Sequence, residues 1–130
     1  MIVVDASVLA PALADDHFEG DRARQRLRGE GLAAPQILDL EVMSVWRGLV
    51  RAGDLSARRA SFAIDDLRDL PVTRFPHLPL LARAWRLRDN LSLYDAAYVT
   101  LAELLGCALV TTDRRLAAAP GIGCRVDVLS

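Results

Sequence analysis

Two short apolar runs, each followed within two residues by an aspartate, constrain the fold of this chain most strongly. The first run is Met1–Val4, which precedes Asp5, and the second is Ala108–Thr111, which precedes Asp113. Short β-branched runs of this kind are typical of strands buried on both faces of a parallel sheet. Ligands of such sheets usually bind beyond the carboxyl ends of the strands, so the sequence predicts that the two aspartates lie at a functional edge.

Helical segments separate these runs from further strand candidates. Capping residues and apolar periodicity predict helices over residues 7–14, 17–28, 35–51, 56–69, 76–88 and 92–105, with a short turn over 114–119. Strands are predicted over 32–34, 72–75 and 125–129. Short strands that alternate with longer helices indicate an α/β layer fold. We therefore expect one domain over residues 1–130, with a mostly parallel sheet of four or five short strands flanked by helices.

The composition supports a compact protein and limits its chemistry. Hydrophobic residues make up 52% of the chain and charged residues 25%, values close to those of ordinary globular proteins. No apolar run approaches the roughly 20 residues of a membrane span, so we expect a cytoplasmic protein. With a net charge of -1, binding a polyanion would require a local basic patch or a metal ion.

The chain contains no lysine, and all 16 basic residues are arginines. This excludes an amine nucleophile, a P-loop lysine and a lysine-assisted phosphoaspartate site. The two cysteines, Cys107 and Cys124, lack the spacing of a zinc site or a disulfide framework, and we predict that both are buried thiols.

Four acidic residues are candidate site residues, although each has an ordinary structural explanation. Asp5 and Asp113 precede helices and could cap them. Asp95 follows Ser92 by three residues, which is the spacing of a capping box. Glu41 lies in the first turns of its helix, where the helix dipole favours negative charge.

The helical periodicity nevertheless favours a shared site. Asp95 falls on the apolar arc of its helix, with Tyr98, Val99, Ala102 and Leu105. Glu41 falls at the border of an apolar stripe that we predict to contain Leu38, Val42, Val45 and Leu49. Clustered carboxylates repel one another and require a cation or a shared proton, and ligands that are all oxygen atoms select Mg²⁺ or Mn²⁺.

The order and spacing of these motifs resemble those of the PIN-domain ribonucleases, specifically the VapC-type toxins of toxin–antitoxin pairs. The resemblance runs along the whole chain. Four motifs carry it, namely Val3-Val4-Asp5-Ala6-Ser7, Glu41, Ser92-Leu93-Tyr94-Asp95-Ala96-Ala97-Tyr98 and Leu109-Val110-Thr111-Thr112-Asp113-Arg114.

The resemblance implies a Rossmann-like PIN fold, endonuclease activity on structured RNA such as tRNA or rRNA loops, Mg²⁺ or Mn²⁺, a homodimer and a VapB-type antitoxin. It implies that Asp5, Glu41, Asp95 and Asp113 are the catalytic acids and metal ligands, with the hydroxyl groups of Ser7 and Thr111 in support. Two alternatives stay open: a PIN-fold binding module without catalysis, and an aspartate-dependent phosphatase.

Other residues have weaker indications of function. An acidic site needs nearby arginines to hold RNA, and Arg83, Arg86, Arg114 and Arg115 are the candidates. We expect His17 and His77 on the surface, and Trp46 and Trp85 in the core or in an interface.

Overall fold

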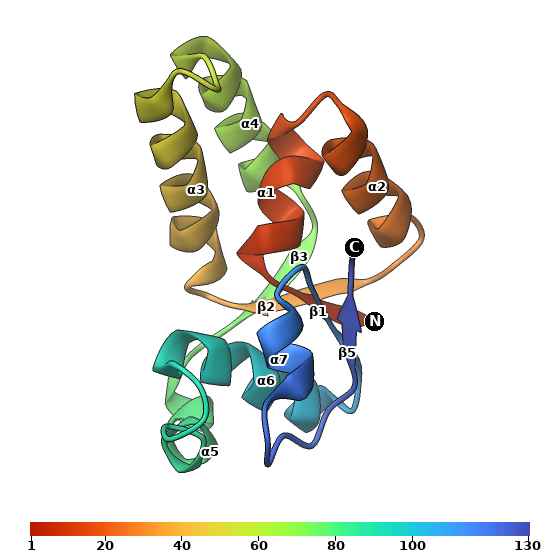
Figure 1. Cartoon of the computed structure of the whole chain (residues 1–130), viewed down its shortest axis with the longest axis vertical. Coiled ribbons are helices and arrows are strands. Elements are labelled where there is room, and N and C mark those ends of the chain that lie inside the picture. The colour runs from red at the N-terminus through yellow and green to blue at the C-terminus, as the bar shows by residue number, and fades with distance from the viewer.

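All five strands of the protein form one parallel sheet, with the order β3-β2-β1-β4-β5. A computed structural model describes all 130 residues (Figure 1). The expected α/β class and parallel sheet are confirmed. The strands are β1 (Ile2–Val4), β2 (Leu32–Pro35), β3 (Val72–Phe75), β4 (Leu109–Thr111) and β5 (Val126–Val128).

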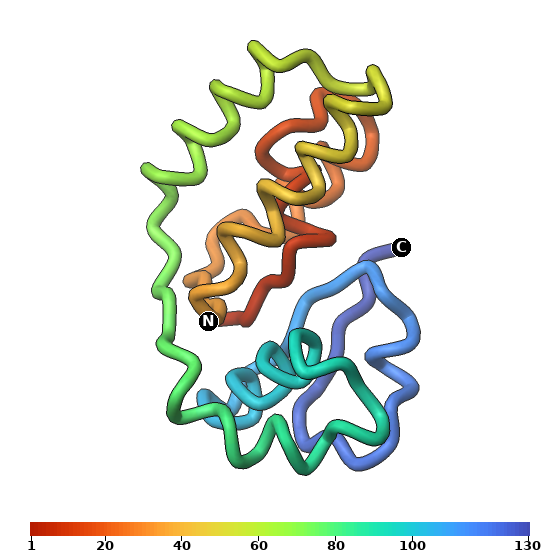
Figure 2. The backbone as a smooth tube through the Cα atoms, turned by 90° about the vertical axis from the view of Figure 1, so that its left-hand side faces the viewer, coloured from red at the N-terminus to blue at the C-terminus, as the bar shows by residue number.

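The helices cover the two faces of the sheet. In Figure 2 the helices coloured from red to yellow-green lie on one side, and those coloured from teal to blue lie on the other. The first group is α1 (Ala6–Ala14), α2 (Phe18–Leu27), α3 (Leu38–Ala52) and α4 (Ala57–Asp69). The second is η1 (Leu78–Leu80), α5 (Leu81–Arg86), α6 (Leu93–Leu105) and α7 (Arg114–Ala118). None of these helices has the length and apolarity needed to cross a bilayer.

The register of the two central strands places the ends of distant segments side by side. Val4 of β1 pairs with Val110 of β4, and the amide of Asp5 donates to the carbonyl oxygen of Val110 at 3.3 Å. Asp5 therefore leaves β1 beside the point at which Thr111 ends β4. Both strands are fully buried because helices cover each face of the sheet, which explains their β-branched composition.

Most helix boundaries follow from capping residues. The hydroxyl groups of Ser56 and Ser92 accept hydrogen bonds from the amides of Arg59 and Asp95, and α3 and α6 end at glycines with positive φ, Gly53 and Gly106. Two predicted boundaries were wrong. Pro35 ends β2 instead of opening α3, which begins at Leu38, and the helix predicted over 76–88 is divided into η1 and the shorter α5.

The buried face of α3 differs from the predicted stripe. Leu38, Val42 and Trp46 are buried, whereas Val45 and Leu49 are exposed. Trp46 shifts the buried face because its indole reaches the core and donates to the carbonyl oxygen of Ala10 in α1, at 3.1 Å. A core position for Trp46 is thus confirmed.

Trp85 was expected in the core or in an interface. It is 58% exposed, so it lies outside the core, and an interface position stays a prediction. Cys107 and Cys124, which we predicted to be buried thiols, are free thiols that are only partly buried. Each lies just outside a strand, Cys107 before β4 and Cys124 before β5.

Candidate active site at the carboxyl edge of the sheet

Asp5 is the most buried of the predicted site acids. It is 8% exposed, and its position after β1 makes it the N-cap of α1. One carboxylate oxygen accepts hydrogen bonds from the amide and the hydroxyl group of Ser7, and the other accepts from the hydroxyl group of Thr111 at 2.5 Å. The capping explanation is therefore confirmed for Asp5, and its role in a site stays a prediction that the same position allows.

Hydroxyl groups join Asp5 to the end of β4. The hydroxyl oxygen of Ser7 accepts from the amide of Thr112 at 2.9 Å, and that of Thr111 accepts from the amide of Asp113 at 3.1 Å. Ser7 and Thr111 thus bind the Asp5 carboxylate and the loop that carries Asp113 at the same time. Their hydrogen bonds fix the position of both acids relative to the sheet.

The buried carboxylate of Asp5 has no positively charged side chain as a hydrogen-bond partner. Burial raises the pKa of Asp5 above its ordinary value of 3.8; the hydrogen bonds from Ser7 and Thr111 oppose this rise, and the charge of Asp95 adds to it. A cation bound at this edge would therefore lower the free energy of the folded protein.

Asp95 in α6 is affected by the charge of Asp113, which follows β4. Burial raises the pKa of the Asp95 carboxyl group, and the charge of Asp113 raises it further while Arg115 lowers it. Asp113 caps α7 and forms an ion pair with the exposed guanidinium of Arg115, which lowers the pKa of Asp113. Arg115 therefore partly neutralises this side of the site.

Glu41 reaches the site region from the other layer of helices. It lies in the first turn of α3 and is half-buried, as its border position predicted. Its Oε1 atom accepts a hydrogen bond of 2.6 Å from the hydroxyl group of Tyr98 in α6. The sequence placed Tyr98 on the arc of Asp95 but gave no sign of this bond, because it joins residues that are far apart along the chain.

The four acids offer oxygen ligands only, a set that suits Mg²⁺ or Mn²⁺. They do not form a ready-made coordination shell: no three acidic, histidine or cysteine side chains in the chain are arranged to hold a metal ion. Asp5, Asp95 and Asp113 would hold such an ion, since the charges of Asp95 and Asp5 interact, as do those of Asp113 and Asp95. Glu41 would join them, because the hydroxyl group of Tyr98 that it accepts from is also affected by the charges of Asp5 and Asp95. The donor chemistry thus suits a divalent ion.

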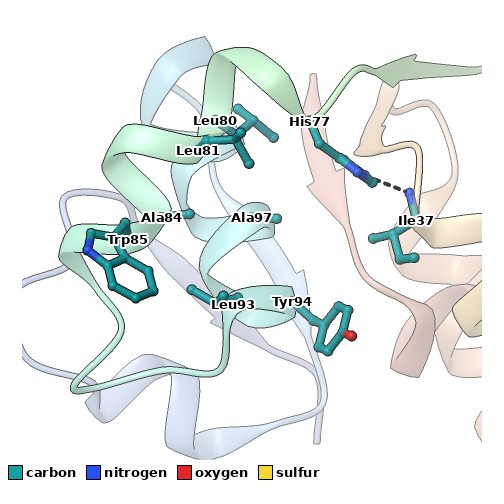
Figure 3. A pocket seen from close by; sticks show the side chains of 9 residues that line it. All are labelled: Ile37, His77, Leu80, Leu81, Ala84, Trp85, Leu93, Tyr94 and Ala97. Carbon is teal, nitrogen blue, oxygen red and sulfur yellow. Dashed lines mark hydrogen bonds between the residues drawn. The ribbon is translucent and has the colours of Figure 1, made fainter.

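The histidines and the predicted RNA-binding arginines differ in their surroundings. His17 is exposed as expected, but His77 is partly buried, and its Nε2 atom accepts from the amide of Ile37 before α3 (Figure 3). Arg83 donates to both carboxylate oxygens of Glu103 and to the carbonyl oxygen of Gly121. The guanidinium of Arg83 therefore connects α5 to Glu103 of α6 and to the loop that contains Gly121.

The remaining predicted arginines, Arg86, Arg114 and Arg115, are exposed. Arg114 and Arg115 lie in the first turn of α7, directly after Asp113. This position keeps two positive charges beside the carboxylates at the sheet edge.

Comparison with known proteins assigns the family. Residues 2–122 match the PIN domain family. Ribonuclease VapC9 of Mycobacterium tuberculosis is 43% identical over 129 residues, which cover 99% of this chain and 98% of that protein. The chain belongs to the VapC ribonuclease family of PIN-domain proteins. Its membership confirms the family indicated by the motifs around Asp5, Glu41, Asp95 and Asp113.

Solved structures show the same fold as this VapC-family chain. The sarcin-ricin loop cleaving toxin VapC20 of Mycobacterium tuberculosis is similar with a TM-score of 0.70 and 17% identity, over 95% of this chain and 97% of that one. A toxin–antitoxin complex from Klebsiella pneumoniae is similar with a TM-score of 0.66 and 22% identity, over 100% of this chain and 98% of that one.

Proposed function

We propose that the protein is a metal-dependent endoribonuclease that acts as the toxin of a toxin–antitoxin pair. The observation that carries the proposal is the buried carboxylate of Asp5, held by Ser7 and Thr111 at the edge of the sheet where Asp113 also emerges. The VapC ribonuclease relatives support cleavage of RNA as the reaction. Since its substrate would be cellular RNA, the protein would act in the cytoplasm.

The proposed reaction is hydrolysis of a phosphodiester bond. A bound Mg²⁺ or Mn²⁺ would supply a Lewis acid for the phosphate and would lower the pKa of a water molecule. The chain contributes the ligands Asp5, Asp95, Asp113 and Glu41, and Ser7 and Thr111 orient the Asp5 carboxylate. We propose that Arg114, Arg115 and Arg86, which are exposed, contact the RNA backbone, with Arg115 shared between the RNA and Asp113.

The family suggests structured RNA, such as a tRNA or rRNA loop, as the substrate. The neighbouring structure of VapC20, described as a sarcin-ricin loop cleaving toxin, supports this choice through its fold. The toxin–antitoxin complex from Klebsiella pneumoniae supports a protein antitoxin in the same way. We propose that a VapB-type antitoxin, made with this protein, inhibits it.

Metal and RNA together test the proposed activity. We expect purified protein to cleave total cellular RNA at discrete positions with Mn²⁺ or Mg²⁺ and to leave it intact with EDTA. The same ions, without RNA, should raise the melting temperature once their concentration exceeds the dissociation constant. Fragment sequencing identifies the cleaved loop. A protein that gains no stability from either ion and cleaves nothing would instead be a PIN-fold binding module.

We also propose a homodimer that forms through an apolar cavity of about 520 Å³ between η1, α5 and α6 (Figure 3). Its rim exposes Leu81, Trp85 and Leu93, with 55%, 58% and 49% of their surfaces accessible. Exposed apolar side chains gathered in this way mark an interaction surface. Light scattering should give twice the chain mass of 14.2 kDa. Leu81→Glu should give monomers, and a monomeric wild type would contradict the dimer.

A further inference from the structure

We propose that Tyr98 is a positioning residue for Glu41 and that its hydroxyl group sets the affinity of the acidic site for a divalent cation. The inference rests on the proposed function, because the cation belongs to that function. It assigns a role to an uncharged residue, the last one of the motif that contains Asp95.

The hydrogen bond between Tyr98 and Glu41 connects two layers of the fold. Tyr98 belongs to α6 on one face of the sheet, and Glu41 belongs to α3 on the other (Figure 1). The tyrosine is 2% exposed, so packing fixes its ring, and its hydroxyl group lies 2.6 Å from Oε1 of Glu41. A rigid residue of one layer therefore holds a flexible side chain of the other.

No other residue hydrogen-bonds to or forms an ion pair with the carboxylate of Glu41. Its carboxylate forms no salt bridge, and Tyr98 provides its one hydrogen bond. The side chain lies at the border of α3 with solvent, so without Tyr98 it would turn freely among several rotamers. Its second oxygen, Oε2, has no protein partner and remains available as a ligand. Tyr98 thus orients the carboxylate without saturating it.

Tyr98 also lies within the electrostatic reach of the other acids. Burial raises the pKa of its hydroxyl group first, followed by the hydrogen bond to Glu41 and the charges of Glu41, Asp5 and Asp95. Three of the four predicted acids, Glu41, Asp5 and Asp95, therefore raise the pKa of the Tyr98 hydroxyl group. The same phenol is one helical turn from Asp95, so its position is fixed relative to two of these acids at once.

The test replaces only the hydroxyl group. Tyr98→Phe keeps the buried ring, and Tyr94→Phe is the matched control, because Tyr94 lies on the same helix, is 62% exposed and makes no side-chain hydrogen bond. Calorimetric titration of each protein with Mn²⁺, without RNA, measures the affinity. We expect Tyr98→Phe to weaken binding by about 10-fold to 100-fold and Tyr94→Phe to leave it unchanged. Saturating Mn²⁺ should restore most of the cleavage rate of Tyr98→Phe.

A second pair of variants separates positioning from general packing. In a Glu41→Ala background, adding Tyr98→Phe should change the Mn²⁺ affinity by less than about twofold, because the partner of the hydroxyl group is already gone. Full additivity of the two substitutions would overturn the positioning role. A wild type that binds Mn²⁺ and cleaves RNA alongside an equally competent Tyr98→Phe would overturn this inference alone. A wild type that does neither would overturn the proposed function as well.

Discussion

Asp5→Asn lowers the rate of RNA cleavage by roughly 10³-fold or more, because it removes the buried charge that would hold the divalent cation. Asparagine keeps the shape of aspartate and one carbonyl oxygen, which can still accept from the amide and hydroxyl group of Ser7. Single-turnover cleavage of a labelled RNA at saturating metal gives the rate. Cleavage at the wild-type rate would remove Asp5 from the site.

The stability of the same variant provides the control for folding. The pKa of Asp5 is raised in the folded protein, so the wild type loses stability as the pH rises through that raised value. Asp5→Asn escapes this loss. Without metal at neutral pH it should therefore melt at the wild-type temperature or above, and any gain should shrink as the pH falls toward 3.8. A lower melting temperature at neutral pH would show that the charge stabilises the fold.

Trp46→Ala is expected to destabilise the protein by about 3–5 kcal/mol, the cost of removing a large aromatic side chain from a packed core. Trp46 is 2% exposed, and its indole N–H also donates to Ala10, so the substitution loosens α3 from α1. Urea unfolding followed by circular dichroism measures the loss.

Phe62→Ala is the matched control for this effect. Phe62 is another large aromatic residue on a helix, but it is 53% exposed, so its removal should change stability by no more than about 0.5 kcal/mol. Equal losses for the two variants would contradict the assignment of Trp46 to the core.

Local signals in the sequence predicted the strands and most helix boundaries, since these depend on nearby residues. Ser56, Ser92 and Gly106 act through hydrogen bonds or backbone angles within one turn, and each was read correctly. Pro35 was misread because a proline suits both the end of a strand and the start of a helix. The strand register that places Pro35 opposite Phe75 decided between these two positions.

The site was predictable only as a set of residue types at strand ends and helix borders. Asp5 was recognised from its position after a buried run, but its contact with Thr111 depends on the pairing of β1 with β4. The contacts of Tyr98 with Glu41 and of His77 with Ile37 join residues 57 and 40 positions apart. The periodicity within one helix carries no information about partners of this kind.

The order of the strands along the chain determines when the site can exist. Asp5 follows the first strand to be synthesised, whereas Thr111 and Asp113 belong to the last part of the chain. Ser7 supplies one of the hydroxyl groups that hold the Asp5 carboxylate early in synthesis, but the other, from Thr111, arrives only when β4 joins β1. The four acids can therefore gather at the sheet edge only when nearly the whole chain has been synthesised.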